Sequence, residues 1–273
     1  MPELPEVETI RRGVEPHVQG RTIVHTLVRD RRLRFGVPED LEIRLQDQPI
    51  VGLRRRAKYL IFELPTGALL IHLGMSGRLH VLMPEAMPAP GKHAHLDLGL
   101  DDGTVLRLTD PRRFGMALWA SKPVDQHKLL HALGPEPTPQ DWSAEQLIRA
   151  CRHRSASIKS VLMDQRVVVG VGNIYANEAL FQSGIHPNRP AGRISARRLQ
   201  LLHAAVIEVL DEAIRQGGTT LRDFSGADGL PGYFQLSVSV YQREGHPCPN
   251  CGVAIRRMVI GQRATFWCPD CQR

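Results

Sequence analysis

The sequence predicts an α+β protein with a β-rich first domain, a helical second domain and a small cysteine-rich appendage. Short β-branched runs occupy residues 22–120, and apolar residues at helical spacing follow a proline-rich stretch at 134–139. Two Cys-x-x-Cys pairs lie in the last 26 residues. A chain of 273 residues with 42% hydrophobic residues can bury two cores. We expect domains at residues 1–131, 143–236 and 237–273, with a linker at 132–142.

The first domain is expected to begin with a helix over residues 3–18 and to continue as a β-sandwich. Apolar residues recur at spacings of three and four from Leu4 to Val18, which is typical of an amphipathic helix. Turn sequences at 65–67 (Pro-Thr-Gly) and 101–103 (Asp-Asp-Gly) predict hairpins, and many short strands joined in this way favour a sandwich. The expected strands are 22–28, 50–53, 59–64, 68–73, 95–100, 105–108 and 116–120.

The second domain is expected to be mostly helical. Ser143 and Gln146 form the pattern of a capping box at the start of a helix over 143–151. A longer helix is expected over 195–215, where Gly217 and Gly218 end it. Together with the strands before the linker, these helices give the α+β assignment.

The charge of the chain favours a polyanionic partner. Lys and Arg number 35 against 28 acidic residues, a formal net charge of +7, so nucleic acid is the first candidate. No apolar run approaches the ~20 residues of a membrane span, and Glu3, Glu6 and Glu8 stand where a secretory signal would carry positive charge. We therefore expect a cytoplasmic protein that does not bind membranes.

The cysteine pairs predict one structural zinc ion. Sixteen residues separate the pairs, a spacing that lets two tight turns offer four thiolates to a tetrahedral metal with no position left for water. The basic segment between them, 256–263, is either a solvated hairpin or a phosphate-binding tip formed by Gln262 and Arg263. Cys151 stands apart, and we expect it to pack in a helix. The expected zinc ligands are Cys248, Cys251, Cys268 and Cys271.

The N-terminus carries a candidate nucleophile. Pro2 favours removal of Met1, which would leave a secondary amine with a reference pKa of about 7.7–8.0, partly unprotonated near neutral pH. Glu3 and Glu6 place two carboxylates on the same helical turn for acid–base chemistry. Pro and Glu are also preferred in the first turn of any helix, so these residues alone leave a structural role open.

Five short motifs and the four cysteines around Arg263 are distributed along the chain. The motifs are residues 2–9 (PELPEVET), 58–60 (KYL), 72–77 (HLGMSG), 110–115 (DPRRFG) and 170–178 (GVGNIYANE). On these residues the sequence resembles, over essentially its whole length, the formamidopyrimidine-DNA glycosylase family of bacterial repair enzymes. The resemblance implies a β-sandwich domain, a helix-two-turn-helix domain and a C-terminal zinc finger.

The resemblance implies a bifunctional glycosylase and abasic-site lyase that acts in base excision repair of oxidised purines. Pro2 would attack C1′ of the deoxyribose, with Glu3 as general acid and Glu6 in support. Lys58 would serve in recognition of the damaged base and in β-elimination, and Arg263 in δ-elimination.

Further residues match the family's DNA contacts. The wedge that fills the space of an extruded base would be Met75, Arg112 and Phe114, although Met75 and Phe114 alone would be read as core residues. For His93, a core histidine is the competing interpretation. The implied DNA ligands are His72, His93, Arg112, Arg154, Lys159, Asn173 and Arg263.

Two features depart from the family pattern, and two other functions stay open. Arg154 stands where many relatives have Lys, and the loop at 217–241, which resembles one that closes over an extruded purine, varies in its later part. An endonuclease VIII-like enzyme for oxidised pyrimidines is a near alternative. A zinc-ribbon DNA-binding protein without catalysis is a more distant one. We expect a monomer that binds damaged double-stranded DNA at the bacterial nucleoid and needs no nucleotide cofactor; the preferred lesion and opposite base stay undetermined.

Overall fold

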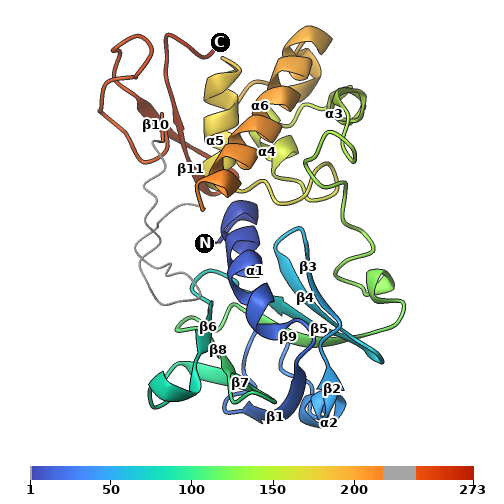
Figure 1. The fold of residues 1–273 in the computed structure, drawn as a ribbon. Coiled ribbons are helices and arrows are strands. Elements are labelled where there is room, and N and C mark those ends of the chain that lie inside the picture. The colour runs from blue at the N-terminus through green and yellow to red at the C-terminus, as the bar shows by residue number, and fades with distance from the viewer. Residues whose placement is uncertain (1, 218–237) are drawn as a thin grey trace. The chain divides into compact units, whose positions relative to one another are not determined.

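The computed structural model describes residues 2–217 and 238–273 (Figure 1). Most of the loop at 217–241 therefore lies outside the described residues. The chain divides into two compact units, and the boundary between them falls between His131 and Ala132. Within the part of the chain that the structure describes, no helix is long and apolar enough to cross a membrane.

The first unit is the β-sandwich that the sequence predicts, with helix α1 (Leu4–Val18) beside it. One sheet has the strand order β2-β1-β7-β8-β6 and the other β3-β4-β5-β9. The strands are β1 (Thr22–Val28), β2 (Gln48–Pro49), β3 (Gly52–Arg56), β4 (Tyr59–Leu64), β5 (Gly67–His72), β6 (Arg78–Leu82), β7 (Ala94–Leu100), β8 (Val105–Thr109) and β9 (Met116–Ser121).

Alternating apolar residues of both sheets form one core. Leu60 and Phe62 of β4 and Leu96 and Leu98 of β7 are all buried in it, as expected for the inner faces of two packed sheets. The apolar face of α1 joins the same core through residues such as Ile10. Both predicted hairpins are present, β4 pairing with β5 and β7 with β8. The short helix α2 (Leu41–Leu45) and strands β2 and β6 were not predicted.

The second unit contains four α-helices among its described residues, α3 (Ala144–Cys151), α4 (Ile158–Leu162), α5 (Asn173–Gln182) and α6 (Ala196–Arg215), and a short 3-10 helix at Ala191–Arg193. Helix α3 begins at the predicted capping box, since Ser143 Oγ accepts the Gln146 N–H at 3.3 Å and Gln146 Oε1 accepts the Ser143 N–H at 2.7 Å. The proline-rich segment packs on this unit: the Gly134 N–H donates to Gln165 O, and Trp142 is buried.

A two-stranded hairpin of β10 (Arg256–Ile260) and β11 (Arg263–Trp267) lies between the two cysteine pairs. Gly261 and Gln262 form its turn, and both have positive φ, 55° and 61°, as a two-residue type I′ turn requires. Phe266 of β11 packs with Phe181 of α5 in a small apolar cluster, which attaches the hairpin to the helical part of the unit.

Candidate active site and nucleic-acid interface

The N-terminal residues form a constrained first helical turn. Glu3 is the N-cap of α1, and its backbone N–H donates to Glu6 Oε2 at 2.7 Å. Both carboxylates are buried, with 2% of each residue exposed. Two buried carboxylates are therefore fixed directly after Pro2, on the turn where the sequence predicts acid–base groups for an α-amine nucleophile.

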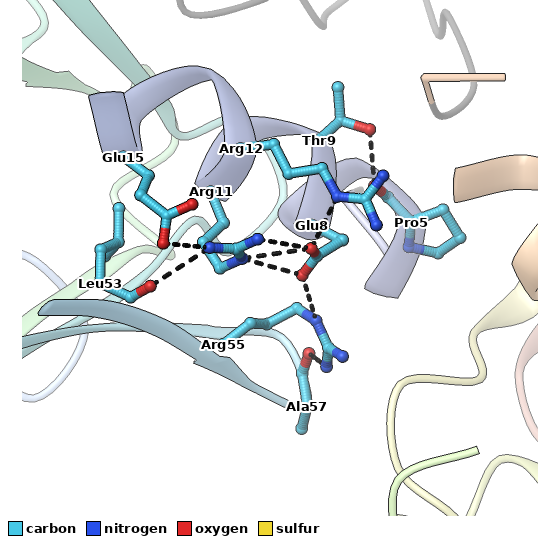
Figure 2. Close-up of polar contacts among 9 residues, drawn as sticks. All are labelled: Pro5, Glu8, Thr9, Arg11, Arg12, Glu15, Leu53, Arg55 and Ala57. Carbon is cyan, nitrogen blue, oxygen red and sulfur yellow. Dashed lines mark hydrogen bonds and ion pairs between the residues drawn. The ribbon is translucent and has the colours of Figure 1, made fainter. Parts of the chain in front are cut away.

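Glu8, farther along α1, gathers three guanidinium groups (Figure 2). Its carboxylate accepts hydrogen bonds from Arg12 Nε at 2.9 Å and from Arg11 Nη2 at 3.0 Å, both on the same helix. Arg55 Nε of β3 donates to Glu8 Oε2 at 3.1 Å, and Arg55 Nη1 donates to Ala57 O at 2.9 Å. Burial opposes ionisation of Glu8, but the arginines outweigh it and lower the pKa of this carboxyl group. The cluster thus ties α1 to β3 and to the turn that contains Lys58.

Lys58 and His72 lie at neighbouring strand ends. Lys58 is the second residue of the β3–β4 turn, after Ala57 with φ 52°, and it is buried. His72 ends β5 opposite Tyr59, with ring centroids 4.9 Å apart. Burial and the charges of Lys58 and Arg34 lower the pKa of His72 to about 4. Because Nδ1 of the neutral ring accepts the Gly74 N–H at 2.9 Å, Nε2 carries the proton and is a donor.

The predicted wedge residues are exposed, so the interpretation of Met75 and Phe114 as core residues is wrong. Met75 is 38% exposed and Phe114 is 43% exposed. The Arg112 guanidinium lies 4.8 Å from the centroid of the Phe114 ring. The wedge residues come from two loops of the first unit that pack tightly, since a Cβ on Gly74 would lie 2.4 Å from the Phe114 carbonyl carbon.

In the second unit three predicted DNA ligands come together at β11. Lys159 Nζ of α4 donates to Thr265 Oγ1 at 2.7 Å and to Ala264 O at 3.2 Å. Asn173, the first residue of α5, donates from Nδ2 to the same Ala264 O at 3.0 Å. Lys159 and Arg263 both line a cavity of about 170 Å³. A lysine, an arginine and the N-terminus of a helix are the groups that proteins use to hold phosphate.

The remaining predicted DNA contacts are less closely grouped. His93 is exposed, so it is not a core histidine; it lies just before β7, and its carbonyl accepts the Asp110 N–H at 3.0 Å. Arg154 forms a 3.7 Å ion pair with Asp164. Cys151 is buried as expected, and burial raises the pKa of its thiol to about 11, which makes it a poor nucleophile.

The four remaining cysteines fit a tetrahedral zinc ion. Their Sγ atoms all lie within 4.8 Å of one another, with Cys248 and Cys271 3.9 Å apart and Cys251 and Cys268 3.4 Å apart. Zinc–sulfur bonds of ~2.3 Å place tetrahedral sulfurs about 3.8 Å apart. These four residues would hold the ion, which would stabilise the hairpin and supply no reaction chemistry because no coordination position stays open.

Four polar residues within the recognised motifs have structural links that the sequence did not reveal. Glu8 and Asp110 bind partners in other segments of the first unit. In α5, Asn177 Oδ1 accepts the Phe266 N–H at 2.8 Å. The neighbouring Glu178 accepts N–H groups of residues 239–241 at 2.8–3.1 Å, which fixes the backbone there. For Asn177 and Glu178 the local signal was two adjacent polar residues in the stretch from Ile174 to Phe181, which is otherwise apolar or aromatic.

Comparison with known proteins agrees with this architecture. Residues 1–117 match the formamidopyrimidine-DNA glycosylase N-terminal domain, residues 133–225 match the H2TH domain of the same enzymes, and residues 245–273 match a zinc finger found in FPG and IleRS. A formamidopyrimidine-DNA glycosylase of Pseudomonas putida is 54% identical over 273 residues, all of both chains. The chain belongs to the formamidopyrimidine-DNA glycosylase family.

Solved structures of family members extend the similarity to three dimensions. The complex of Lactococcus lactis Fpg with DNA that contains an abasic site has a TM-score of 0.92 and 34% identity, over 100% of both chains. MutM (Fpg) from Thermus thermophilus has a TM-score of 0.87 and 39% identity, over 99% of this chain and 98% of that one. This family member therefore has the sandwich, H2TH domain and four-cysteine zinc finger that the sequence predicted.

Proposed function

We propose that the protein is a bifunctional DNA glycosylase and abasic-site lyase that removes oxidised purines, 8-oxoguanine and formamidopyrimidines, from duplex DNA. The observation that carries this proposal is the buried pair Glu3 and Glu6 on the turn that directly follows Pro2. Membership of the family over the full chain supports the same activity. The proposed setting is base excision repair on bacterial DNA, by a cytoplasmic monomer without a nucleotide cofactor.

The reaction begins at the α-amine of Pro2, once Met1 is removed. The nitrogen lone pair forms a bond to C1′ as the glycosidic bond breaks, and the electrons of that bond leave with the base. The Pro2 nitrogen then loses its N–H proton, and the base takes up a proton. The C1′–O4′ bond then opens, Glu3 gives a proton to O4′, and an iminium ion joins Pro2 to C1′. Glu6, bonded to the Glu3 backbone, holds this turn in place.

The iminium ion is an electron sink, so the C2′ proton becomes acidic. Its loss lets the C3′–O bond break and the 3′ phosphate leave, with Lys58 assisting this β-elimination. Loss of a C4′ proton then lets the C5′–O bond break in δ-elimination, to which Arg263 contributes. Water hydrolyses the remaining iminium and releases the Pro2 amine.

A base in a duplex must leave the stack before this chemistry can occur, at a cost of a few kcal/mol. Met75 and Phe114 are apolar and exposed, and they fill the space, while Arg112 bonds the orphaned base. The flanking phosphates are held by Lys159, Asn173 and Arg263 and by the Nε2–H of His72, and His93 and Arg154 are further DNA contacts.

Two alternatives are tested by the same experiment. The hypothesis of an endonuclease VIII-like enzyme predicts activity on oxidised pyrimidines. The hypothesis of a zinc-ribbon DNA-binding protein predicts binding without cleavage. Duplexes that carry 8-oxoguanine, formamidopyrimidine or thymine glycol, each opposite cytosine or adenine, are incubated with the wild type and with Glu3→Gln. Glu15→Gln, in which the altered carboxylate lies on the same helix and pairs with Arg11, is the matched control.

The proposal predicts release of the oxidised purines and strand products with phosphate at both ends. Glu3→Gln should lose base release by two orders of magnitude or more, and Glu15→Gln should keep it. Preferential release of thymine glycol would favour the pyrimidine enzyme. Binding with no release from any duplex would leave only the DNA-binding protein.

A further inference from the structure

The buried carboxylate of Asp110 joins the two loops that carry the exposed wedge residues. Its Oδ1 accepts the Ser76 hydroxyl at 2.6 Å, from the loop that follows β5. The same oxygen accepts the Arg112 N–H at 3.2 Å, and Oδ2 accepts the Gly115 N–H at 2.7 Å, both from the loop before β9. Asp110 is fully buried, so these bonds form away from water, where they are strong.

The backbone around Asp110 leaves the two loops little freedom to separate. The Arg112 N–H also lies 3.1 Å from Ser76 Oγ, so this hydroxyl links both loops. A Cβ on Gly115 would lie 3.0 Å from Asp110 Oδ2 and 3.0 Å from His72 O. His95 Nε2 of β7 lies 2.8 Å from Asp110 O, which anchors the aspartate to the sheet.

We propose that Asp110 is a positioning residue for base extrusion, one that locks Met75, Arg112 and Phe114 into a single rigid wedge. This inference rests on the proposed glycosylase activity. When an exposed wedge contacts DNA, the entropy cost of ordering its loops and side chains reduces the free energy gained from the contact. A wedge that is already ordered in the free protein avoids most of that cost. Asp110 therefore acts on the extrusion step and leaves the sugar chemistry at Pro2 untouched.

The two activities of the enzyme separate these steps. Release of 8-oxoguanine requires that a stacked, paired base leave the helix. An abasic site has no base to unstack, so its cleavage depends on the Pro2 chemistry and much less on the wedge. A defect confined to the wedge should consequently lower the ratio of 8-oxoguanine release to abasic-site cleavage.

The decisive variant is Asp110→Asn. It keeps the shape of the side chain but replaces one acceptor oxygen by an NH₂ group, which must face a donor. Asp102→Asn is the matched control, because Asp102 Oδ1 accepts the Thr104 N–H at 2.9 Å in the β7–β8 turn, at the other end of that hairpin from Asp110. Single-turnover rates at saturating protein are measured on a duplex with 8-oxoguanine opposite cytosine and on the same duplex with an abasic site, together with the melting temperature.

The proposal predicts that Asp110→Asn lowers 8-oxoguanine release at least tenfold and changes abasic-site cleavage less than threefold, while Asp102→Asn changes neither. Equal losses in both reactions, or no loss in either, would overturn it. If Asp110→Asn does not fold, Ser76→Ala decides: it removes the hydroxyl link between the loops and should lower the ratio at least threefold, and an unchanged ratio would overturn the proposal. A wild type inactive on both duplexes would instead overturn the proposed function and this inference with it.

Discussion

The substitution Glu8→Gln tests whether the arginine cluster holds α1 on the sheet. Gln keeps the shape of Glu8 and one oxygen acceptor but removes the negative charge that Arg11, Arg12 and Arg55 share. The Glu8 and Arg55 side chains are only 11% and 13% exposed, so their ion pair is largely shielded from water. Removing one partner of a buried pair costs about 3–5 kcal/mol, and the partial exposure here reduces the expected loss to roughly 2–3 kcal/mol.

The loss is measured by thermal unfolding. In a chain of this size each kcal/mol lowers the melting temperature by roughly 2–4 °C, so we expect a fall of about 4–12 °C near neutral pH. Arg12→Gln is the control, because Arg12 is 56% exposed and its ion pair with Glu8 lies within α1; it should lose no more than about 1 kcal/mol.

The pH dependence gives the result that would refute this reasoning. The fold lowers the pKa of Glu8, so its stabilisation is fully present above the unfolded value of 4.5 and is lost as the pH falls through the lower folded value. The difference between wild type and Glu8→Gln should therefore narrow in acid. A melting temperature equal to that of the wild type, or a difference that does not change with pH, would show that the cluster does not tie the helix to the sheet.

Three further predictions concern zinc, phosphate binding and His72. Chelation of zinc should unfold the finger and abolish DNA binding. Unfolding should change the fluorescence of Trp267, whose ring centroid lies 4.2 Å from that of His186. Unchanged fluorescence after metal loss would contradict this prediction. Lys159→Met should weaken binding similarly for all duplex sequences and lower the slope of log affinity against log salt by about 1, and an unchanged slope would exclude a phosphate contact. Because the pKa of His72 is about 4, an NMR titration should find its ring neutral at neutral pH; its contribution to stability is full above 6.5 and declines as the pH falls toward 4, and a midpoint near 6.5 would contradict the structure.

Local sequence signals predicted the fold where they were strong. The strands 22–28 and 59–64 and the two hairpin turns were predicted with the bounds or positions that the structure has. Helix α5 was missed as an element because every residue from Ile174 to Phe181 is buried, so the helix has no polar face to give a 3.6-residue period. Strand β6 was missed although Arg78 and His80 alternate with Leu79 and Val81, because it is only five residues long and pairs with β8 and not with the next strand along the chain.

The residues of the site also differ in whether local sequence patterns could predict them. The cysteine spacing is local and predicted the zinc ligands directly. The motif around Pro2 predicted two carboxylates at Glu3 and Glu6, and the structure adds that both are buried. The roles of Glu8 and Asp110 arise from partners 47 and 34 residues away, Arg55 and Ser76, and no pattern near either acid indicates those contacts. Such roles become visible only when the fold brings the segments together.

The identity of the atom that bonds to the sugar tests the account most directly. The active protein is incubated with a duplex that contains 8-oxoguanine in the presence of borohydride, the adduct is digested with a protease, and the peptide that carries the nucleotide is sequenced by mass spectrometry. We predict a reduced linkage on the nitrogen of Pro2 in a chain that has lost Met1. An adduct on Lys58 or another lysine, or a fully active protein that retains Met1, would contradict the mechanism.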